Sequence, residues 1–291
     1  MASGKTTTGA LSDSLPVVID SARIVREFPG VMTKSVDRVK LPEGTGLAWN
    51  EISLAQIEAQ AVTETTTFDN PQLLSDTLLT ITPTVTGITT VITDRTMQRI
   101  SKNVVSQIGK LAQNAIERKK DEDGIATLDG ATTSLCGTAT TLTSGHIAAA
   151  ANRIVGNVTE PATSALMTVL HPYQLKDIQD EVVAGIGTYA VPQGLTDDYF
   201  RKGFSGTLYN TNVMEDGNIP INSTPDAKGG VFAREAIILV QGHDLRTETK
   251  RLPEYGGGAD QLFIYDEYAY GERSAGNWLF EIMSDATVPT S

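Results

Sequence analysis

Hydrophobic positions recur with the period of an α-helix over one long stretch of the chain. Met97, Ile100, Val104, Ile108, Leu111 and Ala115 are spaced by three and four residues, and charged residues stand between them. Thr93 and Asp94 can cap such a helix, so the pattern predicts a helix that begins at about Asp94 and ends before Gly124. At 1.5 Å per residue, it would be roughly 40 Å long. A helix of this length predicts an elongated molecule.

Alternation with period two predicts strands on both sides of this helix. Residues 79–87 alternate apolar side chains with threonines, and Pro83 marks an edge or a bulge in that strand. Residues 261–270 also alternate, and a second strand at 278–283 follows after a turn. We expect these last two strands to form a hairpin that packs on the long helix.

Residues 41–93, which precede the long helix, carry few large apolar side chains and predict an extended loop. A two-stranded ribbon is marginally stable alone in water. It needs a second surface, which a neighbouring copy of the same chain supplies in a symmetric assembly.

The middle of the chain predicts a mixed α/β domain. Ser144 can cap a helix that ends at Gly156, and residues 165–170 form a candidate buried strand. This strand leads into His171 and Pro172, where a second helix begins. Short strands are predicted at 207–210, 230–233 and 237–240. A glycine-containing loop at 185–206, between the second helix and these strands, carries Tyr189, Tyr199 and Phe204.

Composition limits the classes of function. The 291 residues carry a formal net charge of −12, which argues against a dedicated nucleic-acid binder and against docking on an anionic membrane. The single cysteine, Cys136, excludes an intrachain disulfide. No apolar run has the length of a signal peptide or a transmembrane helix, so we expect neither export nor a membrane anchor.

No motif predicts catalysis, a cofactor or a metal. Gly4-Lys5-Thr6 lacks the strand and glycine of a phosphate-binding loop, and the partial Gly-x-Gly at Gly185 lacks its third glycine. His146, His171 and His243 lie far apart in the sequence and are expected at helix starts and in a turn. The acidic residues 121–123 indicate a solvated helix end. A hydrolase or transferase site near His171 and His243 is the alternative from another class.

The order of these parts, an arm, a long loop, a long helix, an α/β domain and returning strands, resembles the tailed-bacteriophage major capsid protein family. The motifs that carry the resemblance are the segments 170–175, 206–213, 230–234 and 266–271. This family has the Hong Kong 97-type α+β fold, which encapsulin shells also use. The resemblance implies an N-terminal arm at 1–40, an extended loop at 41–93, a peripheral domain with its spine helix at 94–130, an axial domain at 131–240 and returning peripheral strands at 241–291.

The resemblance implies a subunit that assembles with itself into hexamers and pentamers of an icosahedral phage head around double-stranded DNA. It would reside in the virion capsid after assembly in the host cytoplasm. The extended loop would lie across an adjacent subunit. The residues expected at intersubunit contacts are Trp49, Ile52, Leu54, Phe68, Leu79, Ile81 and Val85, with Arg95 and Arg99 on the spine helix and Tyr189, Tyr199 and Phe204 in the axial-domain loop.

Further partners follow from the resemblance. Fewer than about 100 residues precede the spine helix, and at about 3.3 Å per residue the arm and loop need all of them. We therefore expect a separate scaffolding protein and no large cleaved domain. The resemblance also implies a portal and a decoration protein. Some members of the family form Lys–Asn links between subunits, but no motif places that chemistry on a residue here, so we expect shells without covalent cross-links. The alternatives are an encapsulin-like compartment, which has the same fold, and a tail-tube or connector protein, which the long helix disfavours.

Overall fold

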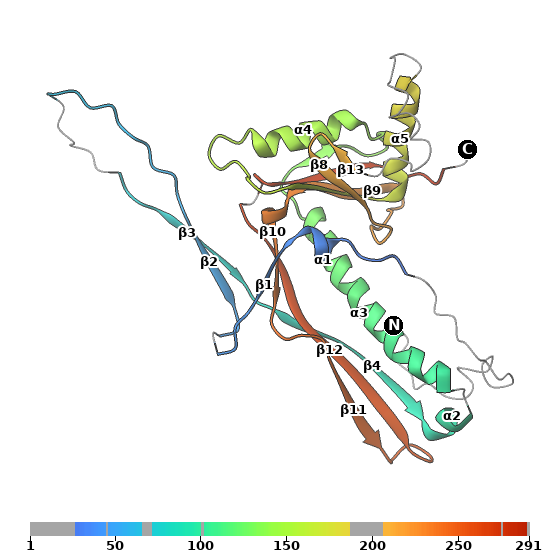
Figure 1. Cartoon of the computed structure of the whole chain (residues 1–291). Helices are drawn as coiled ribbons and strands as arrows, with labels where there is room; N and C mark the ends of the chain where they lie inside the picture. Colours follow the sequence, from blue (N-terminus) through green and yellow to red (C-terminus); the bar gives the residue numbers. More distant parts are fainter. Residues whose placement is uncertain are drawn as a thin grey trace.

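The computed structural model describes residues 27–44, 46–65, 72–99, 102–186, 206–274 and 276–289, with backbone only at 102–107 and 182–186. The molecule is elongated and has three parts (Figure 1). A six-stranded sheet with helices forms one end, and a five-stranded sheet beside a long helix forms the other. A two-stranded ribbon projects from the side of the molecule, between these two parts.

The five-stranded sheet is built around one long strand, β12 (Ala259–Glu272). On one side β12 pairs antiparallel with β10 (Ile237–Gln241) and β11 (Arg246–Leu252). On the other side it pairs with β4 (Thr84–Thr93), and β1 (Asp37–Lys40) adds a parallel strand beside β10. The sheet therefore joins the N-terminal and C-terminal parts of the chain.

The six-stranded sheet has the order β5-β13-β9-β6-β8-β7. Its strands are β5 (Ser134–Cys136), β13 (Leu279–Asp285), β9 (Asp226–Ala233), β6 (Leu166–Leu170), β8 (Thr211–Glu215) and β7 (Thr207–Leu208). Every residue of β6 is buried, as its continuous apolar run requires. Helices α4 (Ser144–Val155) and α5 (Pro172–Ile186) belong to this part, and their starts agree with the sequence prediction.

The long helix is α3 (Lys102–Asp129), which follows the short α2 (Asp94–Arg99). Two of its apolar residues, Ala112 and Ile116, cluster with Ile264 of the five-stranded sheet. Its C-terminal end enters the main core through Ile125 and Leu128. One helix thus contacts both sheets.

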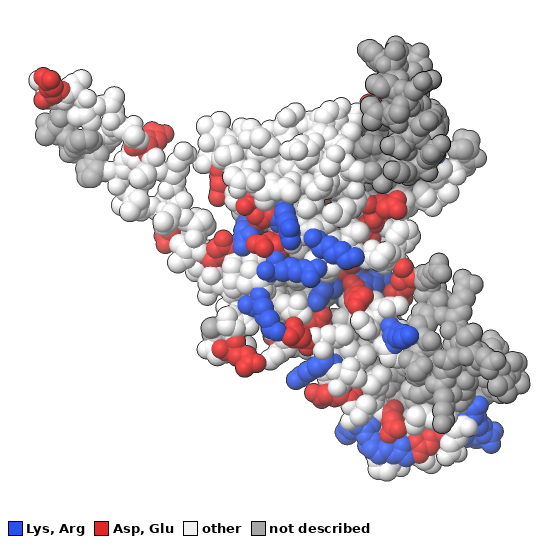
Figure 2. Space-filling view, in the orientation of Figure 1, with Lys and Arg blue, Asp and Glu red and all other residues white. Residues whose placement is uncertain are grey.

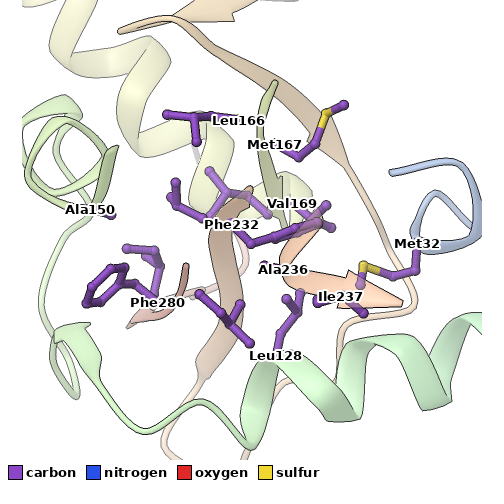
Figure 3. Close-up of a cluster of buried hydrophobic side chains, with 14 of the residues drawn as sticks. Met32, Leu128, Ala150, Leu166, Met167, Val169, Phe232, Ala236, Ile237 and Phe280 are labelled. Atoms are coloured by element: carbon purple, nitrogen blue, oxygen red, sulfur yellow. The ribbon is translucent and has the colours of Figure 1, made fainter. Parts of the chain in front are cut away.

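The main hydrophobic core lies between the six-stranded sheet, α4 and the end of α3. Val169, Phe232, Ala150 and Leu128 are all 0% exposed. Figure 3 shows Leu128 reaching this cluster from α3, with Met32 beside it from the short helix α1 (Met32–Ser35). Burying a large apolar side chain contributes about 1.5–3 kcal/mol, so this cluster fixes the helix relative to the sheet.

The predicted end of the long helix before Gly124 is wrong, because α3 continues to Asp129. Gly124 lies inside α3, and its lack of a side chain lets α1 approach α3 closely. A Cβ atom at this position would lie 2.8 Å from the Cβ of Met32. The glycine therefore serves packing and does not end the helix.

The predicted hairpin between residues 261–270 and 278–283 is also wrong, because these strands lie in different sheets. β12 belongs to the five-stranded sheet, whereas β13 pairs with β9 in the six-stranded sheet. The chain passes between the sheets three times: from β4 through α2 and α3 into β5, from β9 through the 3₁₀ turn Arg234–Ala236 into β10, and from β12 into β13. The last two crossings are hydrogen-bonded, with the Arg273 amide donating to the Ala236 carbonyl at 2.8 Å.

The strand predicted at 79–87 is two strands with different partners. β3 (Asp76–Ile81) ends before Pro83 and pairs with β2 (Trp49–Leu54), while β4 begins after Pro83 and pairs with β12. Proline has no amide hydrogen to donate, which favours the break at this position. Residues 84–93 thus lie in the five-stranded sheet, although the extended loop was expected to reach residue 93.

Candidate assembly surfaces

The projecting ribbon is a hairpin of β2 and β3 with two unlike faces (Figure 1). The register pairs Trp49 with Ile81 and Ile52 with Leu78. Because side chains alternate along each strand, paired residues share a face. Trp49, Glu51, Leu79 and Ile81 form the inner hairpin face, and Ile52, Leu54 and Leu78 give the outer hairpin face its apolar character.

The inner hairpin face packs on the five-stranded sheet. Ile81 is 5% exposed and clusters with Ile238 and Val240 of β10, and Trp49 and Leu79 pack against this cluster. Gly271 makes room for Ile81, because a Cβ atom at Gly271 would overlap the Ile81 side chain. The base of the hairpin is therefore anchored to its own chain.

Arg273 supplies a polar anchor beside this cluster. Its Nε donates to Glu51 Oε2 at 2.6 Å, and its Nη1 donates to Asp37 Oδ2 at 2.8 Å. The guanidinium also lies 5.7 Å from the centre of the Trp49 ring. Its side chain is only 17% exposed. Charge-assisted hydrogen bonds of this kind contribute about 1.5–3 kcal/mol, so they hold the hairpin at a defined angle to the sheet.

The outer hairpin face is apolar and uncovered. Ile52 is 61% exposed, Leu54 74% and Leu78 60%. Ile57, Leu73 and Leu74, nearer the tip, are also exposed. In Figure 2 the hairpin is mostly uncharged, with a few acidic side chains. Contiguous exposed apolar surface of this kind marks a site of protein–protein contact.

The structure separates the residues that the sequence placed at intersubunit contacts. Ile52 and Leu54 are exposed on the outer hairpin face, whereas Trp49, Leu79 and Ile81 face their own chain. Val85 is exposed on β4, outside the hairpin, and Arg95 and Arg99 are exposed on α2. Phe68, Tyr189, Tyr199 and Phe204, like the arm up to residue 26, lie outside the described residues. Leu78, and Ile57, Leu73 and Leu74 nearer the tip, are exposed apolar residues that are not among the predicted contacts. Alternation from Leu79 and Ile81 on the same strand could have placed Leu78 on the opposite face.

The histidines have structural roles. His146 completes the capping box of α4 with Thr143, and His171 Nδ1 accepts the amide of Tyr173 at 3.1 Å at the start of α5. Burial lowers the pKa of His171. His243 Nε2 lies 3.8 Å from Glu267 Oε2 of the five-stranded sheet. His243 and His171 therefore have contacts in different parts of the molecule and share no site in these contacts. Within the described ranges no group of three potential metal ligands occurs, and no helix is long and apolar enough to cross a membrane.

Basic side chains gather over the middle of the molecule in Figure 2, with acidic side chains between them. Several form ion pairs, such as Lys40 with Asp244 and Lys119 with Asp123. Lys120 and Asp266 form a buried pair at 2.6 Å that joins α3 to β12. This mixed surface differs from the continuous basic stripe of a dedicated nucleic-acid-binding face.

Protein-family profiles show no match to this sequence, and no curated protein matches it. Solved structures do match. The capsid of the cyanophage P-SCSP1u aligns with a TM-score of 0.71 and 11% identity over 97% of this chain and 96% of that chain. The head of Helicobacter pylori bacteriophage KHP40 gives 0.71 and 11% over 92% and 93%. The capsid of Ralstonia phage GP4 gives 0.68 and 11% over 99% and 100%. Over nearly its whole length, the chain has the Hong Kong 97-type fold of phage capsid proteins.

Proposed function

We propose that this chain is a major capsid protein that assembles with itself into hexamers and pentamers of an icosahedral phage head enclosing double-stranded DNA. Solved phage capsids with the same fold over almost the whole chain support this proposal. So does the elongated shape, which leaves a long perimeter for contacts between copies (Figure 1). The chain then acts as a structural protein, and we assign it no catalytic step.

The observation that carries the proposal is the uncovered outer hairpin face. Ile52, Leu54 and Leu78 lie on a ribbon whose inner face is already used to anchor it. In a monomer these apolar side chains stay in water and contribute no hydrophobic free energy to folding. A neighbouring copy that covers them would bury their apolar surface and stabilise the ribbon.

We assign the parts of the molecule as follows. The five-stranded sheet with α3 is the peripheral domain, and the six-stranded sheet with α4 and α5 is the axial domain, which meets its copies around the hexamer and pentamer axes. β10 and residues 84–93 belong to the peripheral domain because both pair with β12. The hairpin between residues 49 and 81 is the extended loop.

The remaining partners follow from this role. We expect a separate scaffolding protein during assembly in the host cytoplasm, a portal at one vertex and a decoration protein as a further partner. The face of the molecule in Figure 2 carries charges of both signs, and we propose that packaged DNA meets a surface of this kind. Such a surface encloses DNA without binding it tightly, because tight binding needs many unpaired cations at the phosphates.

The test is expression of the chain with and without its scaffolding protein, followed by electron microscopy. We expect closed icosahedral particles, and in infected cells nuclease-resistant double-stranded DNA inside them. Particles that carry a protein cargo and no genome would indicate an encapsulin-like compartment instead. Tubes, open rings or a monomer at every concentration would contradict the proposal.

A further inference from the structure

Residues 27–32 connect the predicted arm to the rest of the chain, and they lie at the junction where α3 and the turn after β8 come together. We call this segment the arm root. Phe28 packs on Gly217, where an added Cβ atom would lie 2.5 Å from its ring. Gly30 packs on Asp121 of α3, where an added Cβ atom would lie 2.5 Å from the carboxyl carbon. The arm root therefore lies against both α3 and the turn that follows β8.

Two aspartates hold the backbone of the arm root. The Met32 amide donates to Asp121 Oδ1 at 3.0 Å, and the Val31 backbone lies close enough to the carboxyl group of Asp216 to favour its charged form. Asn218 links the same groups, since its side chain donates to Asp121 Oδ2 at 2.9 Å and its amide donates to Asp216 Oδ1 at 2.9 Å. Both aspartates are 0% exposed. The expectation of a solvated acidic helix end at 121–123 is thus wrong for Asp121, because the arm root covers it.

The two buried carboxyl groups meet at Asn218, which donates one hydrogen bond to each of them, and burial together with the neighbouring Asp121 raises the pKa of Asp216. Carboxylate oxygens only accept hydrogen bonds, so a contact between two of them needs a proton. Asp216 Oδ2 is buried, and no side chain or amide of the described residues donates to it. We propose that Asp121 and Asp216 share one proton, and that loss of this proton releases the arm root from α3 and from the turn after β8.

The surroundings favour the protonated pair. Burial, followed by the neighbouring Asp121, raises the pKa of Asp216 to about 7. The titratable and charged groups around the junction include Tyr268 and Tyr270 of β12, Arg38 of β1, Glu27 of the arm root with its partner Arg118, and Asp123 of α3. Lys34, Glu117 and Lys120 line the same hollow as Pro29 and Gly30, and Glu122 and Lys228 line the same hollow as Asn218. Burial raises the pKa of Tyr270, which therefore stays neutral. No Lys or Arg in the described part of the chain offsets the shift of Asp216.

The proposed release has a direction in pH. Below about pH 7 one proton joins the carboxyl groups and the Met32 amide of the arm root stays bound. Above it both carboxyl groups ionise, and two neighbouring buried negative charges repel each other and draw in water. The arm root is then free to move, so acid favours the seated arm and alkali favours the free arm. This inference concerns contacts within one chain and holds whether or not the chain forms shells.

Hydrogen–deuterium exchange of the unassembled full chain tests the release. With a pKa of about 7, the protonated fraction falls from about one half at pH 7 to about one tenth at pH 8, so the protection of amides 27–35, corrected for intrinsic exchange, should fall about fivefold over this interval. Asp216→Asn, which stays neutral, should remove this dependence. Asp129→Asn, at an exposed aspartate of α3, the helix that carries Asp121, should keep the dependence on pH. Protection that does not change with pH in the wild type, or that changes equally in Asp216→Asn, would overturn the proposal.

A second measurement needs no variant. Carbon-13 NMR of the wild-type chain labelled at its aspartate carboxyl groups follows each titration directly. We expect one aspartate to titrate near pH 7, well above the usual value of about 3.9. If every aspartate carboxyl group titrates below about pH 5, no proton is shared at the junction and the inference fails.

Discussion

The outer hairpin face offers the sharpest prediction. Replacing Ile52, Leu54 and Leu78 together by threonine removes its apolar surface and places β-branched residues, which strands prefer, at all three positions. The three side chains are 61%, 74% and 60% exposed in the monomer. Full burial of such a side chain contributes about 1.5–3 kcal/mol, so covering the exposed two thirds is worth about 1–2 kcal/mol each. The substitutions should weaken each hairpin contact by roughly 3–6 kcal/mol, or about 10²–10⁴-fold.

The same substitutions should hardly affect the isolated subunit. Substitutions at exposed positions usually change the free energy of unfolding by less than about 0.5 kcal/mol. Urea unfolding followed by circular dichroism measures this stability, and light scattering measures the lowest protein concentration at which shells form. The control exchanges exposed polar residues on the opposite face of the same strands, Ser53→Thr with Thr77→Ser. Closed shells of the triple variant at the wild-type concentration would refute the reasoning.

Three further predictions concern the folded subunit. Gly271→Ala should destabilise it by about 1–3 kcal/mol in urea unfolding, because the new methyl group displaces Ile81, whereas Gly256→Ala, with open space around it, should cost much less. Gln174→Ala should cost about 2–4 kcal/mol by the same assay, since this buried side chain accepts the His171 amide at 3.0 Å and donates to the Ala227 carbonyl at 2.9 Å; a loss below about 0.5 kcal/mol would show that these groups find other partners. The pKa of Asp216 is about 7 in the folded chain against 3.8 as its ordinary value, so the folded state binds more protons between these limits and the contribution of this group to stability falls as pH rises from 4 to 7. At about 1.4 kcal/mol per pKa unit, the loss of unfolding free energy is of order 4 kcal/mol. The difference in unfolding free energy between the wild type and Asp216→Asn, measured as a function of pH, should show this loss. Parallel pH profiles of the two proteins would contradict it.

Elements with local sequence signals could be predicted well. Helix α4 has the predicted bounds because its apolar spacing and its glycine end lie within the helix itself. The start of α5 follows from His171 and Pro172, which suit the first turn of a helix. Such signals depend on residues a few positions apart, so no knowledge of the rest of the fold is needed.

Strand partners could not be predicted, because alternation shows that a strand has two faces and not which strand lies beside it. β12 and β13 are near in sequence and lie in different sheets. β11 was missed altogether. Six of its seven residues are exposed, so its sequence shows no apolar face, and its position depends on pairing with β12.

The candidate surface was predicted in outline and not in detail. The scarcity of core residues before the long helix correctly indicates an extended excursion. Which face of the hairpin is free depends on Gly271 and Arg273, which lie about 190 residues later in the chain and anchor the opposite face. The burial of Asp121 was equally hidden, because a charged residue in a charged helix looks solvated until the arm root is seen to cover it.

The central claim is that identical copies form a closed shell and that each covers the hairpin of a neighbour. A cryo-electron microscopy reconstruction of assembled wild-type particles tests it most directly. We predict an icosahedral shell in which Ile52, Leu54 and Leu78 are buried against an adjacent copy. A shell in which these side chains stay in solvent would contradict the account of the hairpin, and a chain that forms no shell with its scaffolding protein would contradict the function.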